Sequence, residues 1–185
     1  MDIQSSVTSL LSILTILGQG IVIILLALLL KSLFSKKENL KLNNLIEKYG
    51  LLFMFIVALI AMSGSLTFSE IIGFVPCRDC WFQRIFMYPQ SVLLLIALWK
   101  HDKNIARYIL ALCSIGILFS IYQYYGQVSV VFNPTTSAVC DASGVSCSDA
   151  PFFYFGYITI PLMTLTAFAM NIVTSILIIR QQKNR

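Results

Sequence analysis

Two cysteines at CxxC spacing, Cys77 and Cys80, lie in the short segment PCRDCWFQR, residues 76–84. The same segment holds Arg78 and Arg84, although only 11% of the chain is charged. A thiol pair at this spacing can form a disulfide that exchanges with another thiol, because a thiolate attacks a disulfide sulfur and forms a mixed disulfide. The segment therefore predicts thiol and disulfide chemistry in charged surroundings.

A second pair, Cys140 and Cys147, lies in VCDASGVSCSD, and the fifth cysteine, Cys113, is expected to be a small buried side chain. The two pairs allow three interpretations: two structural disulfides, one metal site with four thiolate ligands, or two redox pairs in series. In a structural zinc site with four cysteine ligands, both pairs usually have CxxC spacing. Cys140 and Cys147 are separated by six residues and do not have this spacing. A disulfide closed over two residues removes little loop entropy from an unfolded chain. The spacing favours redox pairs without a metal and keeps structural disulfides as the alternative.

The chain is far more apolar than a water-soluble domain, with 58% hydrophobic residues among 185 and a mean hydropathy of +0.84. Crossing a hydrocarbon core of about 30 Å takes roughly 20 apolar residues in a helix. Five stretches reach this length, and helices are expected because open strands leave backbone groups unpaired in lipid. We therefore predict an all-α integral membrane protein with spans at residues 7–30, 49–68, 81–99, 105–125 and 155–179.

Basic residues predict which ends of these spans face the cytoplasm, because lysine and arginine are retained on that side. Eleven of the thirteen lie between spans one and two, between or just inside spans three and four, or after span five, and the other two belong to the CxxC segment. This pattern predicts an outer N-terminus, a cytoplasmic C-terminus and extracytoplasmic cysteine loops at residues 69–80 and 126–154, where disulfides persist. Because no basic stripe is interleaved with aromatics, the net charge of +5 predicts no nucleic acid partner.

Cys80 is predicted to lie at or near the N-terminus of the third span. Unpaired backbone N–H groups and the helix dipole favour a thiolate at that place. Arg84 follows one turn later on the same face, so its positive charge favours the thiolate and an electronegative oxygen beside it. The alternative for Arg84 is an interfacial anchor whose guanidinium reaches the lipid headgroups.

The segment FIVALIAMSGSLTFSEIIGFVPCRDCWFQRIFMYP, residues 55–89, resembles the DsbB family of bacterial disulfide-bond-formation membrane proteins, and within it the BdbC branch. The segment CDASGVSCSDAPFFYFGYITIPLMTLTAFAM resembles the second cysteine pair and the start of the last helix of that branch. The resemblance covers roughly residues 49–180. A CxxC followed by WFQRIFMYP at the start of a membrane helix is a much more specific signal than CxxC alone.

The resemblance implies a four-helix transmembrane bundle with two outer redox loops in residues 49–185. Residues 1–48 would add an extra N-terminal transmembrane helix and a cytoplasmic basic linker, with the protein in the bacterial cytoplasmic membrane. The implied function is a membrane thiol–disulfide oxidoreductase that reoxidises a DsbA-like extracytoplasmic thiol oxidase. It would pass the electrons through two cysteine pairs to a membrane quinone, either menaquinone or ubiquinone.

Carried over by position, the resemblance makes Cys77 and Cys80 the membrane-proximal redox pair, with Cys80 the sulfur that contacts the quinone. Cys140 and Cys147 match the shuttle pair, with Cys140 facing the soluble partner, and Arg84 matches the quinone-associated arginine.

Gln123 stands where many members of the family carry a histidine. A glutamine amide can donate a hydrogen bond to a quinone carbonyl, but it cannot carry a proton as imidazole does. Two alternatives to the family function stay open. The first is a relative of vitamin K epoxide reductase, which is disfavoured because the CxxC of that family comes late in the chain, whereas here it opens the third span. The second is a non-catalytic channel or transporter subunit, which is disfavoured because charged residues within the spans are nearly absent.

Overall fold

This computed structural model describes residues 3–34, 40–132 and 146–183, and Cys140 lies outside them. Within the described residues the protein is all-helical, apart from an isolated antiparallel bridge between Tyr154 and Ile158. Five helices are long and apolar enough to cross a membrane, which confirms the predicted number of spans. They are α1 (Ile3–Phe34), α2 (Leu40–Leu66), α3 (Arg78–Lys100), α4 (Ile105–Phe132) and α5 (Ile160–Lys183).

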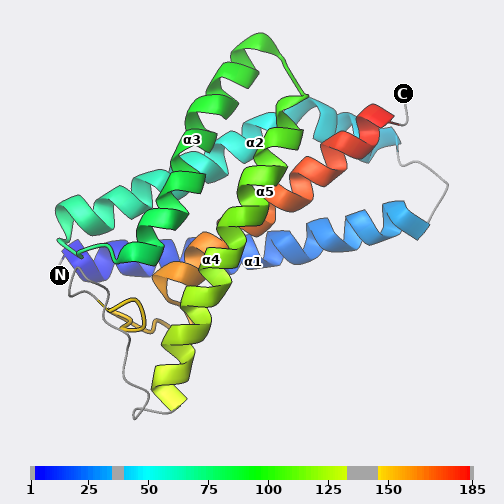
Figure 1. Cartoon of the computed structure of the whole chain (residues 1–185). Helices are drawn as coiled ribbons and strands as arrows, with labels where there is room; N and C mark the ends of the chain where they lie inside the picture. The colour runs from blue at the N-terminus through cyan, green and yellow to red at the C-terminus, as the bar shows by residue number, and fades with distance from the viewer. Residues whose placement is uncertain (1–2, 35–39, 133–145, 184–185) are drawn as a thin grey trace.

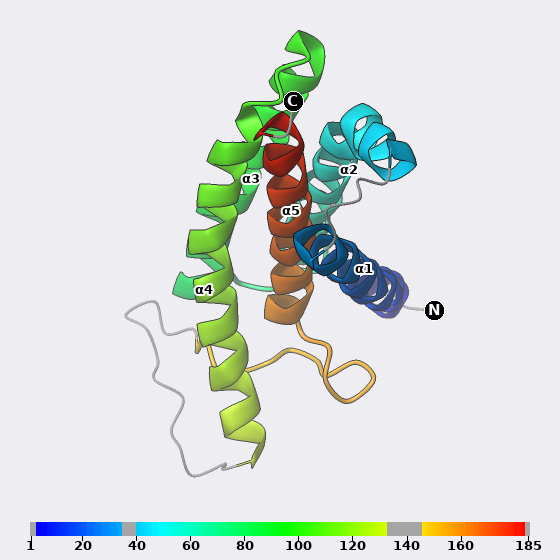
Figure 2. The same ribbon diagram turned by 90° about the vertical axis from the view of Figure 1, so that its right-hand side faces the viewer.

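Helix α5 lies at the centre of the arrangement and packs against α4, α2 and α1, whereas α3 packs between α2 and α4 (Figures 1 and 2). Of the five spans, α5 is the most buried and α1 the least. The main apolar core lies among α2, α3, α4 and α5, and its fully buried members include Met54, Leu94, Ile109 and Phe168.

A glycine allows α4 and α5 to approach closely. A Cβ atom added at Gly116 would lie 2.3 Å from the ring of Phe168, which is itself fully buried on α5. Small residues at such crossings let the helix backbones come together, and packing is the main force between helices in lipid. Gly116 therefore accommodates the largest buried side chain of the core.

A buried polar cluster joins α3, α4 and α5. The side-chain oxygen of Gln90 accepts hydrogen bonds from Asn171 at 3.1 Å and from the thiol of Cys113 at 3.3 Å, while the Gln90 amide donates to the carbonyl of Phe86 at 2.8 Å. Polar side chains inside a membrane protein are expensive unless they pair across helices. Cys113 is fully buried, as predicted, and takes part in this cluster.

The ends of the last two spans differ from the prediction. Helix α4 continues to Phe132, so residues 126–132, which we expected in the second outer loop, are helical. Helix α5 starts at Ile160, five residues after the predicted start of the span. Pro161 lies in its first turn, where the missing N–H costs no hydrogen bond. The preceding residues form a turn in which Phe155 and Gly156 have positive φ values of 53° and 80°.

A π-helical turn, η1 (Thr67–Ile71), follows α2 and leads into the segment that carries the first cysteine. Phe68 of this turn is buried and stacks on Phe74 at 5.9 Å between ring centroids, and both rings approach Phe152 of the second loop. Three aromatic rings thus hold the two cysteine-bearing loops against each other.

Candidate redox site

The CxxC motif forms the N-terminus of α3. Cys77 is the N-cap residue, with extended backbone angles (φ −73°, ψ 174°), and its carbonyl accepts a hydrogen bond from the N–H of Trp81 at 3.1 Å. Cys80 is the third residue of the helix, as the sequence predicted, so it lies where backbone N–H groups are unpaired and the dipole favours negative charge. The two sulfurs are 3.3 Å apart and joined by a hydrogen bond in which Cys77 donates to Cys80.

Cys77 is the member of the pair that keeps its proton. The side chain is only 4% exposed. Its hydrogen bond with Cys80 raises the pKa of the Cys77 thiol above its ordinary value, and burial raises it further. Cys80, as the acceptor of that hydrogen bond, is the sulfur that can carry negative charge.

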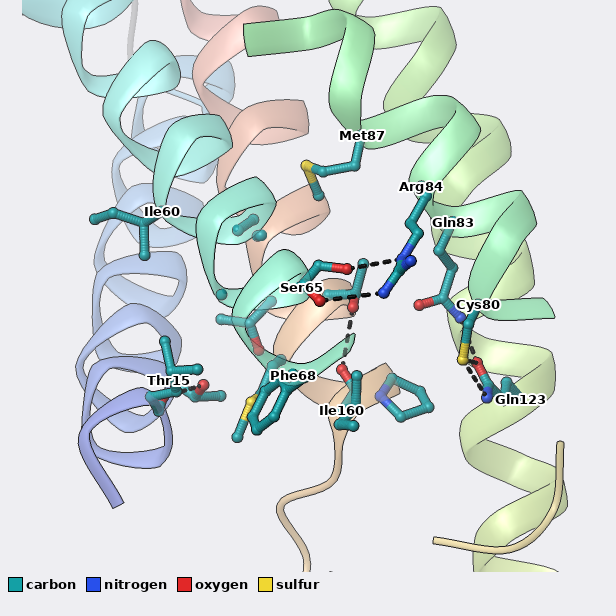
Figure 3. Close-up of a pocket in the computed structure, with 18 of the residues that line it drawn as sticks. Thr15, Ile60, Ser65, Phe68, Cys80, Gln83, Arg84, Met87, Gln123 and Ile160 are labelled. Carbon is teal, nitrogen blue, oxygen red and sulfur yellow. Dashed lines mark hydrogen bonds between the residues drawn. The ribbon is translucent and has the colours of Figure 1, made fainter. Parts of the chain in front are cut away.

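The amide of Gln123 on α4 connects the cysteines of both loops, and Figure 3 shows its contact with Cys80. Its nitrogen lies 3.2 Å from the sulfur of Cys77, 3.3 Å from the sulfur of Cys80 and 3.5 Å from the carbonyl oxygen of Cys147. Its oxygen accepts a hydrogen bond of 2.6 Å from the amide of Gln83, so the orientation of the Gln123 amide is fixed. The residue that the sequence suggested as a quinone contact therefore touches the sulfurs.

Cys147 of the second loop meets the start of α3. Its thiol interacts with the thiol of Cys77 and with the backbone of Asp79. Partial burial raises the pKa of Cys147 above the ordinary value for a thiol. One cysteine of the second pair is thus in direct contact with one cysteine of the first, whereas its partner Cys140 falls in the part of the chain that is not described.

Arg84 points into the bundle toward α2 (Figure 3). Its Nε donates to the hydroxyl of Ser65 at 3.0 Å and its Nη2 to the carbonyl oxygen of Ser65 at 3.1 Å. The hydroxyl of Tyr88 also donates to the Ser65 hydroxyl, at 3.1 Å. The guanidinium lies 5.3 Å from the ring centroid of Trp81 and 6.0 Å from that of Tyr88, distances that suit cation–π contacts. These partners hold the partly buried guanidinium against α2 and the rings of Trp81 and Tyr88.

A cavity of about 760 Å³ begins at the sulfurs and runs between the helices. Cys77, Cys80, Arg84 and Gln123 line one end of it, and Figure 3 shows the last three; mostly apolar side chains of α1, α2, α3 and α5 line the remainder. This volume falls within the range of small-molecule sites in proteins, about 300–1,000 Å³. Its lining suits an amphiphilic molecule with one polar end.

Two residues of the site, Gln83 and Ser65, were not identified from the sequence. Gln83 is 4% exposed although it lies in a membrane-spanning helix. A polar amide inside a membrane-spanning helix often marks a functional site. The glutamine of the WFQR segment could have been recognised on this ground. Ser65 could be recognised only as a small packing residue, because its bond to Arg84 joins positions 19 residues apart.

Comparison with known proteins places this chain in a family. The model of the family described as "Disulfide bond formation protein DsbB" matches residues 47–178. The chain is 45% identical over 118 residues to "Disulfide bond formation protein C" of Bacillus subtilis, an alignment that covers 64% of this chain and 83% of the relative. It is 38% identical over 128 residues to the "SPbeta prophage-derived disulfide bond formation protein B" of the same species, covering 69% and 84%.

A third relative, the "Probable disulfide formation protein C" of Halalkalibacterium halodurans, is 41% identical over 148 residues, which is 80% of this chain and 98% of the relative. No solved structure matches the chain significantly. The matches support a membrane disulfide oxidoreductase and a multi-pass bacterial membrane protein, and they speak against a channel or transporter subunit. On the family match and the identities of these relatives, the chain belongs to the DsbB family of disulfide bond formation proteins.

Proposed function

We propose that this protein reoxidises a DsbA-like thiol oxidase outside the cytoplasm and passes the electrons, through two cysteine pairs, to a membrane quinone. One observation carries the proposal: Cys77, Cys80 and Cys147, from two different loops, meet around the Gln123 amide beside an apolar cavity. Structural loop disulfides need no such convergence. A redox relay needs both the contact between pairs and the access to an oxidant.

In the first step, a thiolate of the reduced partner attacks the disulfide between Cys140 and Cys147, at Cys140. A mixed disulfide forms, and the second partner thiol resolves it. The partner leaves as a disulfide, and Cys140 and Cys147 are left as thiols. Two electrons have then moved from the partner to the second cysteine pair.

In the second step, Cys147 as a thiolate attacks Cys77 in the disulfide of the first pair, and Cys80 leaves as a thiolate. The contact between the Cys147 and Cys77 thiols supports this choice of sulfurs. Cys140 then attacks Cys147, which restores the Cys140–Cys147 disulfide and releases Cys77 as a thiol. The two electrons now belong to the first pair, with negative charge on Cys80, where the helix dipole favours it.

The polar end of the cavity fits the ring of a quinone, and the apolar remainder fits its tail. When bound, a quinone accepts the two electrons and two protons that accompany closure of the Cys77–Cys80 disulfide. Arg84 would hold a quinone oxygen near Cys80, because Ser65 and two aromatic rings fix its guanidinium at the cavity wall. Gln123 positions the sulfurs through its amide nitrogen, and in this reduced arrangement that nitrogen is occupied by them.

A quinone also satisfies the energetics of the reaction. DsbA-type oxidants have potentials near about −120 mV, so an ordinary structural disulfide near roughly −300 mV cannot reoxidise them. A strongly oxidising acceptor is required. Respiratory quinones are such acceptors, and they dissolve in the bilayer that surrounds these helices.

The proposal includes the orientation and the domain arrangement predicted from the sequence. The N-terminus and both cysteine loops face outward, and the C-terminus faces the cytoplasm. Residues 49–185 form the redox bundle of four helices, and residues 1–48 supply the additional helix and a basic linker. The packing of α2, α3, α4 and α5 around one shared core supports this division.

The test combines the purified protein with a reduced DsbA-like protein and a short-chain quinone, and follows quinol formation by absorbance. We expect catalytic quinol formation that Cys80→Ser reduces to background while the thermal stability stays unchanged. Cys113→Ala is the matched control, since Cys113 lies in the buried polar cluster of the core, and it should retain activity. Absence of quinol with the loop thiols intact would overturn the proposal.

A further inference from the structure

Helix α1 lies outside residues 47–178, the part of the chain that matches the family. It nevertheless packs along α5. Gly18 lies against Thr166 and Met170, where an added Cβ atom would approach their side chains to 3.1 Å and 3.2 Å. Nearer its C-terminal end, Leu29 is buried with Val173 and Leu177. The helix is therefore attached to the bundle by one continuous face.

The same helix reaches across to α2 at the level of the cavity. A Cβ atom added at Gly64 of α2 would lie 3.3 Å from the side chain of Leu11, so the two helices meet closely there. Thr15 lies on the wall of the cavity opposite Cys80 (Figure 3). Helix α1 thus supplies the part of the cavity wall that lies beside α2 and α5.

One face of α1 supplies this wall. Its cavity-lining residues recur at helical spacing, and they are Leu11, Leu14, Thr15, Leu17, Gly18 and Ile21. On the opposite face Ile23 points away from the protein, with 68% of its surface exposed. A helix that is apolar on all sides is stable in lipid whether or not it borders a cavity. Membrane insertion alone therefore does not account for the position of this face at the cavity.

The cavity is long as well as apolar. On α2 its lining extends from Phe53 to Ser65. Twelve helical steps at 1.5 Å each correspond to about 18 Å along the axis. Arg84, which is bonded to Ser65, and the nearby Cys80 lie toward the Ser65 end of this length. A flat ring at that end would leave most of the length for an apolar chain.

We propose that α1 is the outer wall of a channel for the isoprenoid tail of the quinone, and that it makes the affinity of this protein depend on tail length. The inference rests on the proposed function. A tail that moves from lipid into this channel gains no hydrophobic free energy, because both surroundings are apolar. Its gain comes from shape and packing, which α1 provides by separating the tail from the bilayer.

The test compares substitutions at adjacent positions of α1. Leu14→Trp narrows the channel and Leu11→Ala opens it. Their controls, Ile13→Trp and Leu10→Ala, change side chains that do not line the cavity and that are 48% and 60% exposed. Dissociation constants are measured by equilibrium binding in lipid nanodiscs for menadione, which has no tail, and for menaquinone-4, which has one. Melting temperatures without a quinone show whether each variant is folded.

We expect Leu14→Trp and Leu11→Ala to weaken binding of menaquinone-4 by about threefold or more, a size usual for residues in direct contact. Binding of menadione should stay at the wild-type value, and both control variants should bind both quinones normally. Equal effects on the two quinones, or no effect on either, would show that α1 is not a tail wall.

The two proposals fail in different ways. If the wild-type protein binds neither quinone and forms no quinol, the proposed function is wrong. If it reduces menadione but binds menaquinone-4 with the same affinity in every α1 variant, the function stands and only the role of α1 is wrong. In that case a lipid acyl chain is the better occupant of the channel.

Discussion

Ser65 illustrates how a small residue can determine the placement of a charge. Both of its oxygen atoms, in the hydroxyl and the carbonyl, accept hydrogen bonds from the Arg84 guanidinium, and the hydroxyl also accepts one from the Tyr88 hydroxyl. Removing the hydroxyl leaves Arg84 with only one partner on α2. Ser65 is therefore a positioning residue, which acts on the quinone through Arg84.

Ser65→Ala should raise the KM for the quinone about fivefold, the effect of losing one hydrogen bond of roughly 1 kcal/mol. The KM for the thiol partner should not change, because in the proposed reaction that partner reacts with the second cysteine pair and does not contact Arg84. Initial rates measured against each substrate in turn provide the check. Ser63→Ala, an exposed position two residues earlier on α2, is the control. Equal changes in both KM values would contradict the positioning role.

The site residues that belong to a short sequence motif could be predicted. The residues that contact them from a neighbouring helix could not. Cys77, Cys80 and Arg84 follow from one segment. The bond between Gln83 and Gln123 depends on the rotation of α3 relative to α4. The sequence of an apolar span gives little information on which face of the helix turns toward its neighbours, because the lipid and the protein interior favour the same side chains.

At the scale of the helices, hydropathy located all five spans but not their ends. Helix α4 runs two turns beyond the predicted span, since residues 126–132 contain no proline and remain largely apolar. The start of α5 is determined by the turn around Gly156 and by Pro161, neither of which changes the hydropathy. Ends of this kind depend on local backbone geometry, which a composition window does not detect.

The crossing of α4 and α5 allows a direct test of packing. Gly116→Ala should destabilise the protein by about 1–3 kcal/mol, because the added methyl group overlaps the buried ring of Phe168. Thermal unfolding in detergent measures the loss. Gly20→Ala on α1 is the matched control, since no atom lies within 4 Å of the added Cβ atom there. A normal melting temperature for Gly116→Ala would show that Phe168 moves freely and that this crossing is loosely packed.

At the scale of the whole molecule, the orientation in the membrane is a prediction from the basic residues alone. All eleven predicted cytoplasmic lysines and arginines lie in three short segments. The structure places Cys77 and Cys147 together, so both must be on the same side. That this side is the outer one is the prediction from the basic residues.

An impermeant maleimide added to reduced, right-side-out membrane vesicles should label Cys147. It should not label Asn104→Cys, which places a thiol in the exposed turn between α3 and α4. Detergent should then expose the second thiol to the reagent. Mass spectrometry of the labelled peptides identifies each site. Labelling of Asn104→Cys in sealed vesicles would reverse the proposed topology.

The thiol of Cys147 interacts with that of Cys77, and the sulfur of Cys77 lies 3.3 Å from that of Cys80, with both CxxC cysteines at the cavity. In the proposed reaction, the protein substrate reacts with the second cysteine pair and the lipid-soluble substrate with Cys80. Neither has to dissociate before the other binds, and the two never share a ternary transition state. The resulting kinetics are of the double-displacement kind, in which the cysteines store the electrons between two independent half-reactions.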